Sequence, residues 1–141
     1  KELDALDRLI FVLKWSHAKA HAVFKNDLNK VLICPVITDD IPELSHYVET
    51  WLTAAAPIAF QFRFDRLESQ SFRLLPRVLN SSSRAFIAAT WATHTAGHDD
   101  TRSLTVHPDA GWGWLIQHGF TMIETNHPRA LSHYLREREN K

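Results

Sequence analysis

The sequence predicts an α/β protein in which about five parallel strands alternate with helices. Short apolar runs rich in large and β-branched side chains recur along the chain, and each has the length of a strand. They return at a spacing of roughly thirty residues with helical patterns between them, as in parallel strands joined by helices. Near the end of the chain a helical pattern stops at Gly119 and an apolar run follows at once, as in half of a βαβ unit.

Five segments are predicted to be strands. Residues 9–15 (LIFVLKW) and 31–37 (VLICPVI) are nearly continuous apolar runs, as expected of strands that are buried on both faces. Pro35 interrupts the second run and has no N–H to donate, so we expect this strand to lie at an edge of the sheet or to be irregular. The other predicted strands cover residues 57–64, 84–91 and 120–125.

The segments between the first strands show helical patterns. Residues 17–30 carry Ala, His and Phe side chains near helical spacing. In residues 38–56, Asp40 is a candidate N-cap and an apolar stripe follows it. This stripe consists of Leu44, Tyr47, Val48, Trp51 and Leu52. Residues 3–8 are predicted to be the end of a helix or a linker.

The second half of the chain predicts three further helices. The first covers residues 67–79. Pro76 lies inside this range, so the pattern does not decide whether the helix continues through it. Its inward side chains are expected to be Leu67, Phe72, Leu75 and Leu79. Asp109 is the candidate N-cap of the next helix, and Asn126 caps the last one, with Pro128 in its first turn. The helix after Asp109 has its apolar positions at Trp112, Leu115 and Ile116.

The composition indicates one globular domain. A chain of 141 residues that is 45% hydrophobic can bury a core, and its apolar runs are too short to span a membrane. Sixteen basic and sixteen acidic residues give a formal net charge of zero, which argues against a nucleic-acid partner. Cys34 is the single cysteine and lies in an apolar run, so we expect it in the core. The chain opens on Lys1 without Met, so we expect a processed chain or a piece of a longer protein, and its compartment stays open.

Candidate binding residues lie at the carboxyl ends of the predicted strands. Parallel α/β sheets bind ligands beyond the carboxyl ends of their strands. Lys14 and Arg63 lie at two such ends and would hold a phosphodiester oxyanion, while Trp15 and Trp91 would contact an apolar arm of the ligand. In the alternative interpretation the two cations extend to solvent and the two indoles fill the edge of the sheet.

Two histidine motifs allow a functional and a structural interpretation. His17 and His21 lie at i and i+4, a spacing that can bind zinc, but the Glu of an H-E-x-x-H motif is missing. The alternative is two surface histidines, or one that points inward and one that points outward. His98, Asp99 and Asp100 have the composition of a metal or acid–base cluster. No Gly-rich phosphate loop, G-x-S-x-G or CxxC occurs, so nucleotide binding, serine hydrolysis and thiol redox have no support.

Three segments resemble the closing part of bacterial glycerophosphodiester phosphodiesterases, which are barrels of the PI-PLC-like phosphodiesterase superfamily. The segments are GHDD (97–100), PDAGWGWLIQHGF (108–120) and IETNHPRALSHYLRER (123–138). In that family the equivalent of GHDD follows the seventh strand, so the resemblance implies that it caps a helix at the edge of the substrate site. The resemblance implies that residues 1–141 form one partial domain, the C-terminal half of a (β/α)8 TIM-type barrel. A complete barrel typically needs about 250 residues. Because half a barrel leaves open edges, we expect a missing half barrel or a homo-oligomer partner. A small open α/β domain is the alternative.

The chemistry that this resemblance implies is metal-dependent hydrolysis of a phosphodiester. In that family carboxylates hold Mg or Ca and two histidines act as general acid and base. The H-R-G…P-E-N-T and E-x-D motifs that carry these groups do not occur here. Three further family carboxylates are matched by Val12, Gln61 and Asn126, and an Asn-Thr pair is matched by Ala88 and Ala89. The chain therefore predicts no catalytic residue, no metal ligand and no cofactor of its own, and Mg or Ca is expected only for a complete family member.

Three functional hypotheses follow. In the first, the chain is a fragment or degenerate copy of a phosphoric diester hydrolase of lipid metabolism, inactive unless a missing N-terminal half completes it. In the second, it is a non-catalytic module that binds a glycerol-phosphate-type ligand through Lys14, Arg63, Trp91 and Trp15. In the third, its sheet edges pair with another copy and it serves as an oligomerising element.

Overall fold

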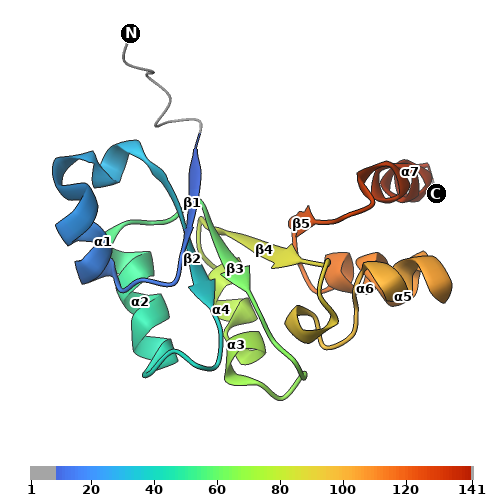
Figure 1. Ribbon diagram of the computed structural model, residues 1–141, viewed down its shortest axis with the longest axis horizontal. Coiled ribbons are helices and arrows are strands. Elements are labelled where there is room, and N and C mark those ends of the chain that lie inside the picture. The colour runs from blue at the N-terminus through green and yellow to red at the C-terminus, as the bar shows by residue number, and fades with distance from the viewer. Residues whose placement is uncertain (1–8, 141) are drawn as a thin grey trace, which may run out of the picture.

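The computed structural model describes residues 9–140, which form one five-stranded sheet. All neighbouring strands pair in parallel, in the order β1-β2-β3-β4-β5, and the helices cover one face of the sheet (Figure 1). The strands are β1 Ile10–Leu13, β2 Leu32–Ile37, β3 Ala59–Phe62, β4 Arg84–Ala88 and β5 Met122–Glu124. The prediction of an α/β fold with five parallel strands is confirmed, and the arrangement is that of half of a TIM-type barrel.

Helices and short 3-10 turns connect successive strands. The α-helices are α1 His17–Phe24, α2 Leu44–Ala54, α3 Gln70–Arg73, α4 Leu75–Leu79, α5 Asp100–Thr105, α6 Trp112–Gln117 and α7 Pro128–Glu139. The 3-10 turns are η2 Lys25–Lys30, η3 Ala92–His94 and η4 Pro108–Ala110. The predicted helix over 17–30 is confirmed as far as Phe24, after which Lys25 adopts φ 49° and the chain tightens into η2. The prediction for residues 3–8 lies outside the described residues.

The core lies between the sheet and its helices. Alternate side chains of β3 and its extension, Phe60, Phe62 and Phe64, point to the helices and are at most 2% exposed. Phe62 meets Phe120 edge-on with ring centroids 5.6 Å apart, and Trp51 from α2 is fully buried in the same core. This burial is what fixes the helix layer on the sheet.

The opposite face of the sheet is defined by Val12, Cys34, Gln61 and Ala88, and we call it the inner face. The predicted core position of Cys34 is confirmed, since it is fully buried. Burial raises the pKa of its thiol to about 12, so the group is a neutral thiol at pH 7 and not a nucleophile.

The predictions for the first two strands are confirmed only in part. β2 is not an edge strand, because it lies between β1 and β3. Pro35 makes it irregular, as expected: pairing with β1 ends at Pro35, and pairing with β3 covers Val36 and Ile37. β1 is not buried on both faces, because Ile10 and Val12 are 44% and 43% exposed and only β2 borders this strand in the described part of the chain.

The predicted N-caps Asp40 and Asn126 are wrong, because α2 begins after Glu43 and α7 begins after His127. The Asp40 carboxylate forms an ion pair with Lys14, and Glu43 adopts a left-handed φ of 49°. The backbone N–H of Asn126 donates to Asp100 Oδ2 (2.8 Å), which holds the loop after β5 one residue before the start of α7. At Asp40 a distant partner thus takes the side chain that would have capped the helix.

The predicted cap Asp109 and the predicted long helix over 67–79 are also corrected. Asp109 accepts a hydrogen bond from the Tyr134 hydroxyl, and α6 begins after Gly111. The segment 67–79 forms α3 and α4, with Pro76 in the first turn of α4. Phe72 and Leu75 pack on the core as expected, whereas Leu67 and Leu79 are both 42% exposed.

Across residues 9–140, no helix is long and apolar enough to cross a membrane.

Candidate functional site

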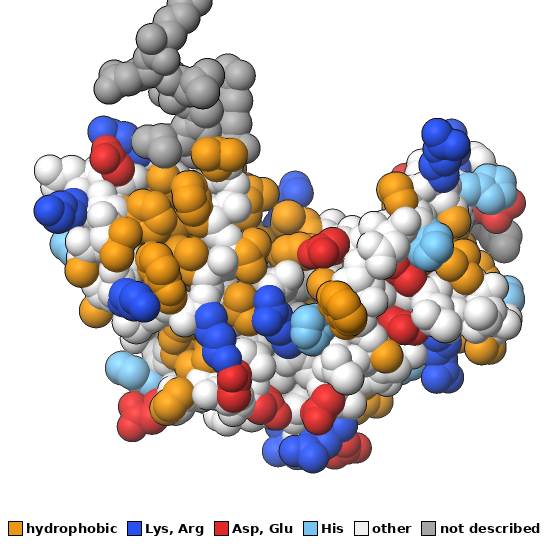
Figure 2. Space-filling view, in the orientation of Figure 1, with side chains coloured by type: hydrophobic (Ala, Val, Ile, Leu, Met, Phe, Trp, Pro, Cys, Tyr) orange, Lys and Arg blue, Asp and Glu red, His pale blue; other side chains and the backbone are white. Residues whose placement is uncertain are grey.

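A polar hollow lies at the carboxyl ends of the first strands and has a volume of about 380 Å³. Its lining residues are Lys14, Thr38, Asp39, Asp40, Arg63, Phe64, Asp65, Arg66, Thr93 and His94. Parallel pairing brings the ends of β1, β2 and β3 together, which is where α/β sheets place their ligand sites. In Figure 2 charged side chains of both signs gather below an apolar surface formed over β1 and its neighbours. The structure thus brings together two of the predicted residues, Lys14 and Arg63.

Arg63 is the most enclosed cation of the polar hollow. One guanidinium nitrogen, Nη2, donates to Gln61 Oε1 at 2.9 Å, and Gln61 is only 4% exposed. The Arg63 Nε is buried and has no hydrogen-bond partner within residues 9–140. The Gln61 amide therefore orients the Arg63 guanidinium, and the Nε–H of Arg63 is a donor without an acceptor.

Lys14 lines the polar hollow together with Arg63 and forms an ion pair with Asp40. Hydrogen bonding from Lys14 holds the pKa of the Asp40 carboxyl below its usual range. The two side chains are 44% and 63% exposed, so solvent screens the pair and it contributes little to stability. Lys14 can therefore exchange Asp40 for another anion at little cost.

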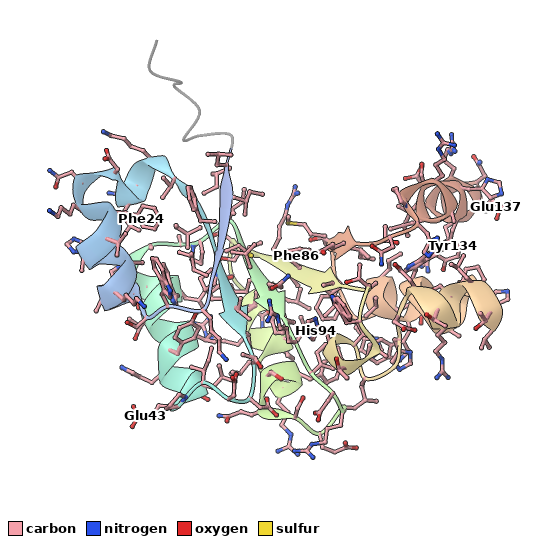
Figure 3. All side chains as sticks on the ribbon, in the orientation of Figure 1. Phe24, Glu43, Phe86, His94, Tyr134 and Glu137 are labelled. Carbon is pink, nitrogen blue, oxygen red and sulfur yellow. The ribbon has the colours of Figure 1, made fainter. Side chains whose placement is uncertain are left out.

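His94 belongs to the same hollow, and the sequence reasoning missed it. It ends η3, where the backbone of the chain pairs with the extension of β3: the Phe64 N–H donates to the His94 carbonyl (3.2 Å). Its Nδ1 is buried with no partner in the described chain. Figure 3 labels the His94 side chain. Burial and the neighbouring charge of Arg63 lower the pKa of its imidazole, so His94 is neutral at pH 7. No motif in the sequence indicates His94, because it comes near Arg63 only through the backbone hydrogen bond between Phe64 and His94.

The two predicted tryptophans lie outside the lining of the polar hollow. Trp15 is half-buried; its carbonyl accepts from Trp51 Nε1 (3.1 Å) and its ring lies under the Lys19 ammonium (4.7 Å). Trp91 is 62% exposed, and its ring centroid is 6.4 Å from that of His94. Trp91 is thus placed beside the hollow, whereas Trp15 supports α2.

The candidate metal ligands do not converge. The rings of His17 and His21 are 6.2 Å apart, and His17 packs edge-on against Trp51. Within residues 9–140 no three His, Cys, Asp or Glu side chains form a group that could hold a metal ion. In the polar hollow, Asp39 accepts from the Ser71 N–H (2.7 Å) and Asp40 pairs with a lysine. These carboxylates are used within the protein, and the set does not fit a hard divalent cation.

The GHDD segment is structural. Asp99 caps α5 by accepting from the Arg102 N–H (2.9 Å), which confirms the helix-capping interpretation. Asp100 is 5% exposed. Its carboxylate accepts hydrogen bonds from Trp112 Nε1 (2.7 Å), Thr125 Oγ1 (2.8 Å) and the Asn126 N–H (2.8 Å). One carboxylate therefore joins α5, α6 and the loop after β5.

His98 gives this part of the molecule a pH-dependent stability. Its ring stacks on Trp114 (3.8 Å between centroids, 5° between planes), and its Nδ1 contacts the Ala110 carbonyl at 2.7 Å. Burial is the main cause that lowers the pKa of His98 in the folded state. The unfolded chain therefore binds more protons as the pH falls through the ordinary histidine range near 6.5, and stability is lost toward acid.

We expect the free energy of unfolding, measured in urea, to decrease from pH 7.5 to pH 5.5, and to decrease less in His98→Gln. His94 has a pKa shift of the same sign, so part of the dependence remains in this variant. His127→Gln is the matched control: this histidine is exposed and its ring has no ion pair or ring contact within residues 9–140, so the variant should keep the wild-type slope. Equal slopes for wild type and His98→Gln would contradict the assignment.

Comparison with known families gives one match. Residues 33–135 match the model of DUF4996, described as a domain of unknown function. This range runs from β2 into α7 and includes the carboxyl ends of β2, β3, β4 and β5. No curated protein matches the chain.

Proposed function

The chain belongs to the DUF4996 family of domains of unknown function, and we propose that it binds the phosphate group of an ester as the C-terminal half of a phosphodiesterase-type barrel. The observation that carries this proposal is the Arg63 guanidinium, held by Gln61 and incompletely hydrogen-bonded, in the polar hollow beside Lys14. A planar guanidinium matches phosphate oxygens with two parallel N–H bonds, and a nearby ammonium adds charge.

His94 and Lys14 suit the same ligand, whereas the carboxylates of Asp39, Asp40 and Asp65 in the lining oppose it. Neutral His94 retains one N–H that can donate to an oxygen, and the exposed pair of Lys14 with Asp40 exchanges readily. The volume of about 380 Å³ falls within the range of small-molecule sites. We therefore expect a glycerol-phosphate-type ligand to occupy the hollow.

Hydrolysis would need groups from outside this chain. The three positions where the resemblance suggests carboxylates are Val12, Gln61 and Asn126, and the amide of Gln61 orients Arg63. In a completed barrel, Mg or Ca would supply the charge that polarises the phosphoryl oxygen. Here Lys14 and Arg63 would bind and orient the phosphate without transferring a proton.

The exposed edge of β1 supports a partner that completes the sheet. Leu9, just before β1, is 49% exposed, and Ile10 and Val12 within β1 are 44% and 43% exposed; β1 pairs on one side only within the described residues. An apolar, unpaired edge favours pairing with another strand. A missing half barrel or a second copy of the chain could supply it, and the second copy corresponds to an oligomerising role.

We expect Arg63→Gln to weaken the binding of glycerol 3-phosphate and of inorganic phosphate at least tenfold. Each hydrogen bond to a charged group is worth about 1.5–3 kcal/mol, which corresponds to that factor or more. Isothermal titration calorimetry at low salt measures the affinity. Arg84→Gln is the matched control because Arg84 is exposed at the opposite, amino end of β4, and it should leave the affinity unchanged.

Equal affinity in wild type and Arg63→Gln would contradict the phosphate site. A second result would contradict the claim that hydrolysis needs another half barrel. That result is turnover of a chromogenic phosphodiester by this chain alone in the presence of Mg or Ca.

A further inference from the structure

We propose that the ligand is a phosphate ester with an apolar substituent, and that this substituent lies in a second hollow between α1 and α2. The inference rests on the proposed function, because it assigns the rest of a ligand whose phosphate occupies the polar hollow. It identifies the chemical class of the ester and a second subsite.

The second hollow, which we call the apolar hollow, has a volume of about 480 Å³. It lies between the loop and first turn of α1 and the loop and first turns of α2, at the same end of the sheet as the polar hollow. Ala18, Ile41, Pro42 and the Tyr47 ring contribute its mostly apolar surface. Small-molecule sites have this size and character.

The two hollows share one ion pair. Lys14 and Asp40 line both of them, so their pair marks the boundary. When Lys14 turns from Asp40 to a phosphate in the polar hollow, the substituent on that phosphate is next to the entrance of the apolar hollow. One ligand can therefore fill both sites.

The charges of the apolar hollow disfavour a second anionic group. Asp40 and Glu43 are among its lining residues and would repel such a group. Tyr47 is 9% exposed, and burial raises the pKa of its hydroxyl, so this side chain adds no charge. An alkyl or aryl group gains from burial there, whereas a polar headgroup would lose hydration.

The test is the affinity for methyl, butyl and hexyl phosphate, measured by calorimetry on the full chain. We expect the affinity to rise about two- to fourfold for each methylene group that is buried. In Ala18→Trp the indole fills the hollow from α1, and the ratio of hexyl to methyl phosphate affinity should fall toward one. Ala22→Trp is the control: Ala22 is also exposed on α1 but does not line the hollow, so the ratio should remain at its wild-type value.

The outcomes separate the two proposals. If inorganic phosphate binds through Arg63 but the affinity does not depend on chain length, the apolar subsite is overturned and the proposed function stands. If no phosphate ligand binds, both are overturned. Vesicles that contain phosphatidic acid distinguish a free ester from a lipid headgroup: binding to vesicles without binding of hexyl phosphate would overturn the assignment to a free ester.

Discussion

Replacing Asp100 by asparagine is expected to lower the free energy of unfolding by about 3 kcal/mol, because a buried acceptor of three hydrogen bonds loses half of its accepting groups. The carboxylate is 5% exposed, so water cannot replace it. An amide NH2 in place of one oxygen would face a donor, either the Trp112 Nε1–H or the Asn126 N–H. Chemical unfolding in urea at pH 7 measures the change.

Two further variants define what is lost. Asp27→Asn removes a carboxylate from an exposed pair with Lys30 and should change stability by less than about 0.5 kcal/mol. Trp112→Phe removes one of the three donors, so the double variant with Asp100→Asn should cost less than the sum of the two single changes. An Asp100→Asn protein as stable as the wild type would show that this carboxylate does not hold the three segments together.

The fold class could be predicted because the pattern that encodes it is local. Apolar runs of strand length at regular spacing specify parallel strands and connecting helices, and the five strands appear where these runs occur. The start of a helix was harder to predict at Asp40, Asp109 and Asn126. Each has the side chain of a good cap, yet the side chains of Asp40 and Asp109 meet partners distant in sequence, and the backbone of Asn126 is held by Asp100. Propensity at a single position is easily overridden by such a contact.

The same distinction applies to the candidate site. Lys14 and Arg63 could be predicted because both follow strands, and the carboxyl ends of parallel strands meet at one edge. His94 could not, because it lies beyond β4 in a 3-10 turn that reaches Arg63 only through the backbone contact with Phe64. The role of Gln61 was also hidden. As a replaced carboxylate it suggested a lost function, whereas its amide orients the arginine.

Gly111 lies at the closest approach of α5 to the start of α6. A Cβ added there would lie 2.0 Å from Ser103 Oγ and 2.6 Å from the Asp99 carbonyl oxygen. The serine cannot simply rotate away, because its hydroxyl donates to the Asp99 carbonyl (2.9 Å) and accepts from the Trp112 N–H (2.9 Å). A side chain of any size must therefore separate the two helices or break this pair of buried hydrogen bonds.

We accordingly expect Gly111→Ala to lower the free energy of unfolding by about 3–4 kcal/mol, from overpacking and the loss of one or two hydrogen bonds. Gly97→Ala is the control: its φ is +81° but no atom lies within 4 Å of the new Cβ, so it should cost only the left-handed backbone, about 1 kcal/mol. In Gly111→Ala, adding Ser103→Ala removes the nearest atom but not the Asp99 carbonyl, so stability should recover only in part. If Gly111→Ala costs no more than Gly97→Ala, close helix approach does not explain this glycine, and the contact between α5 and α6 can open without loss of stability.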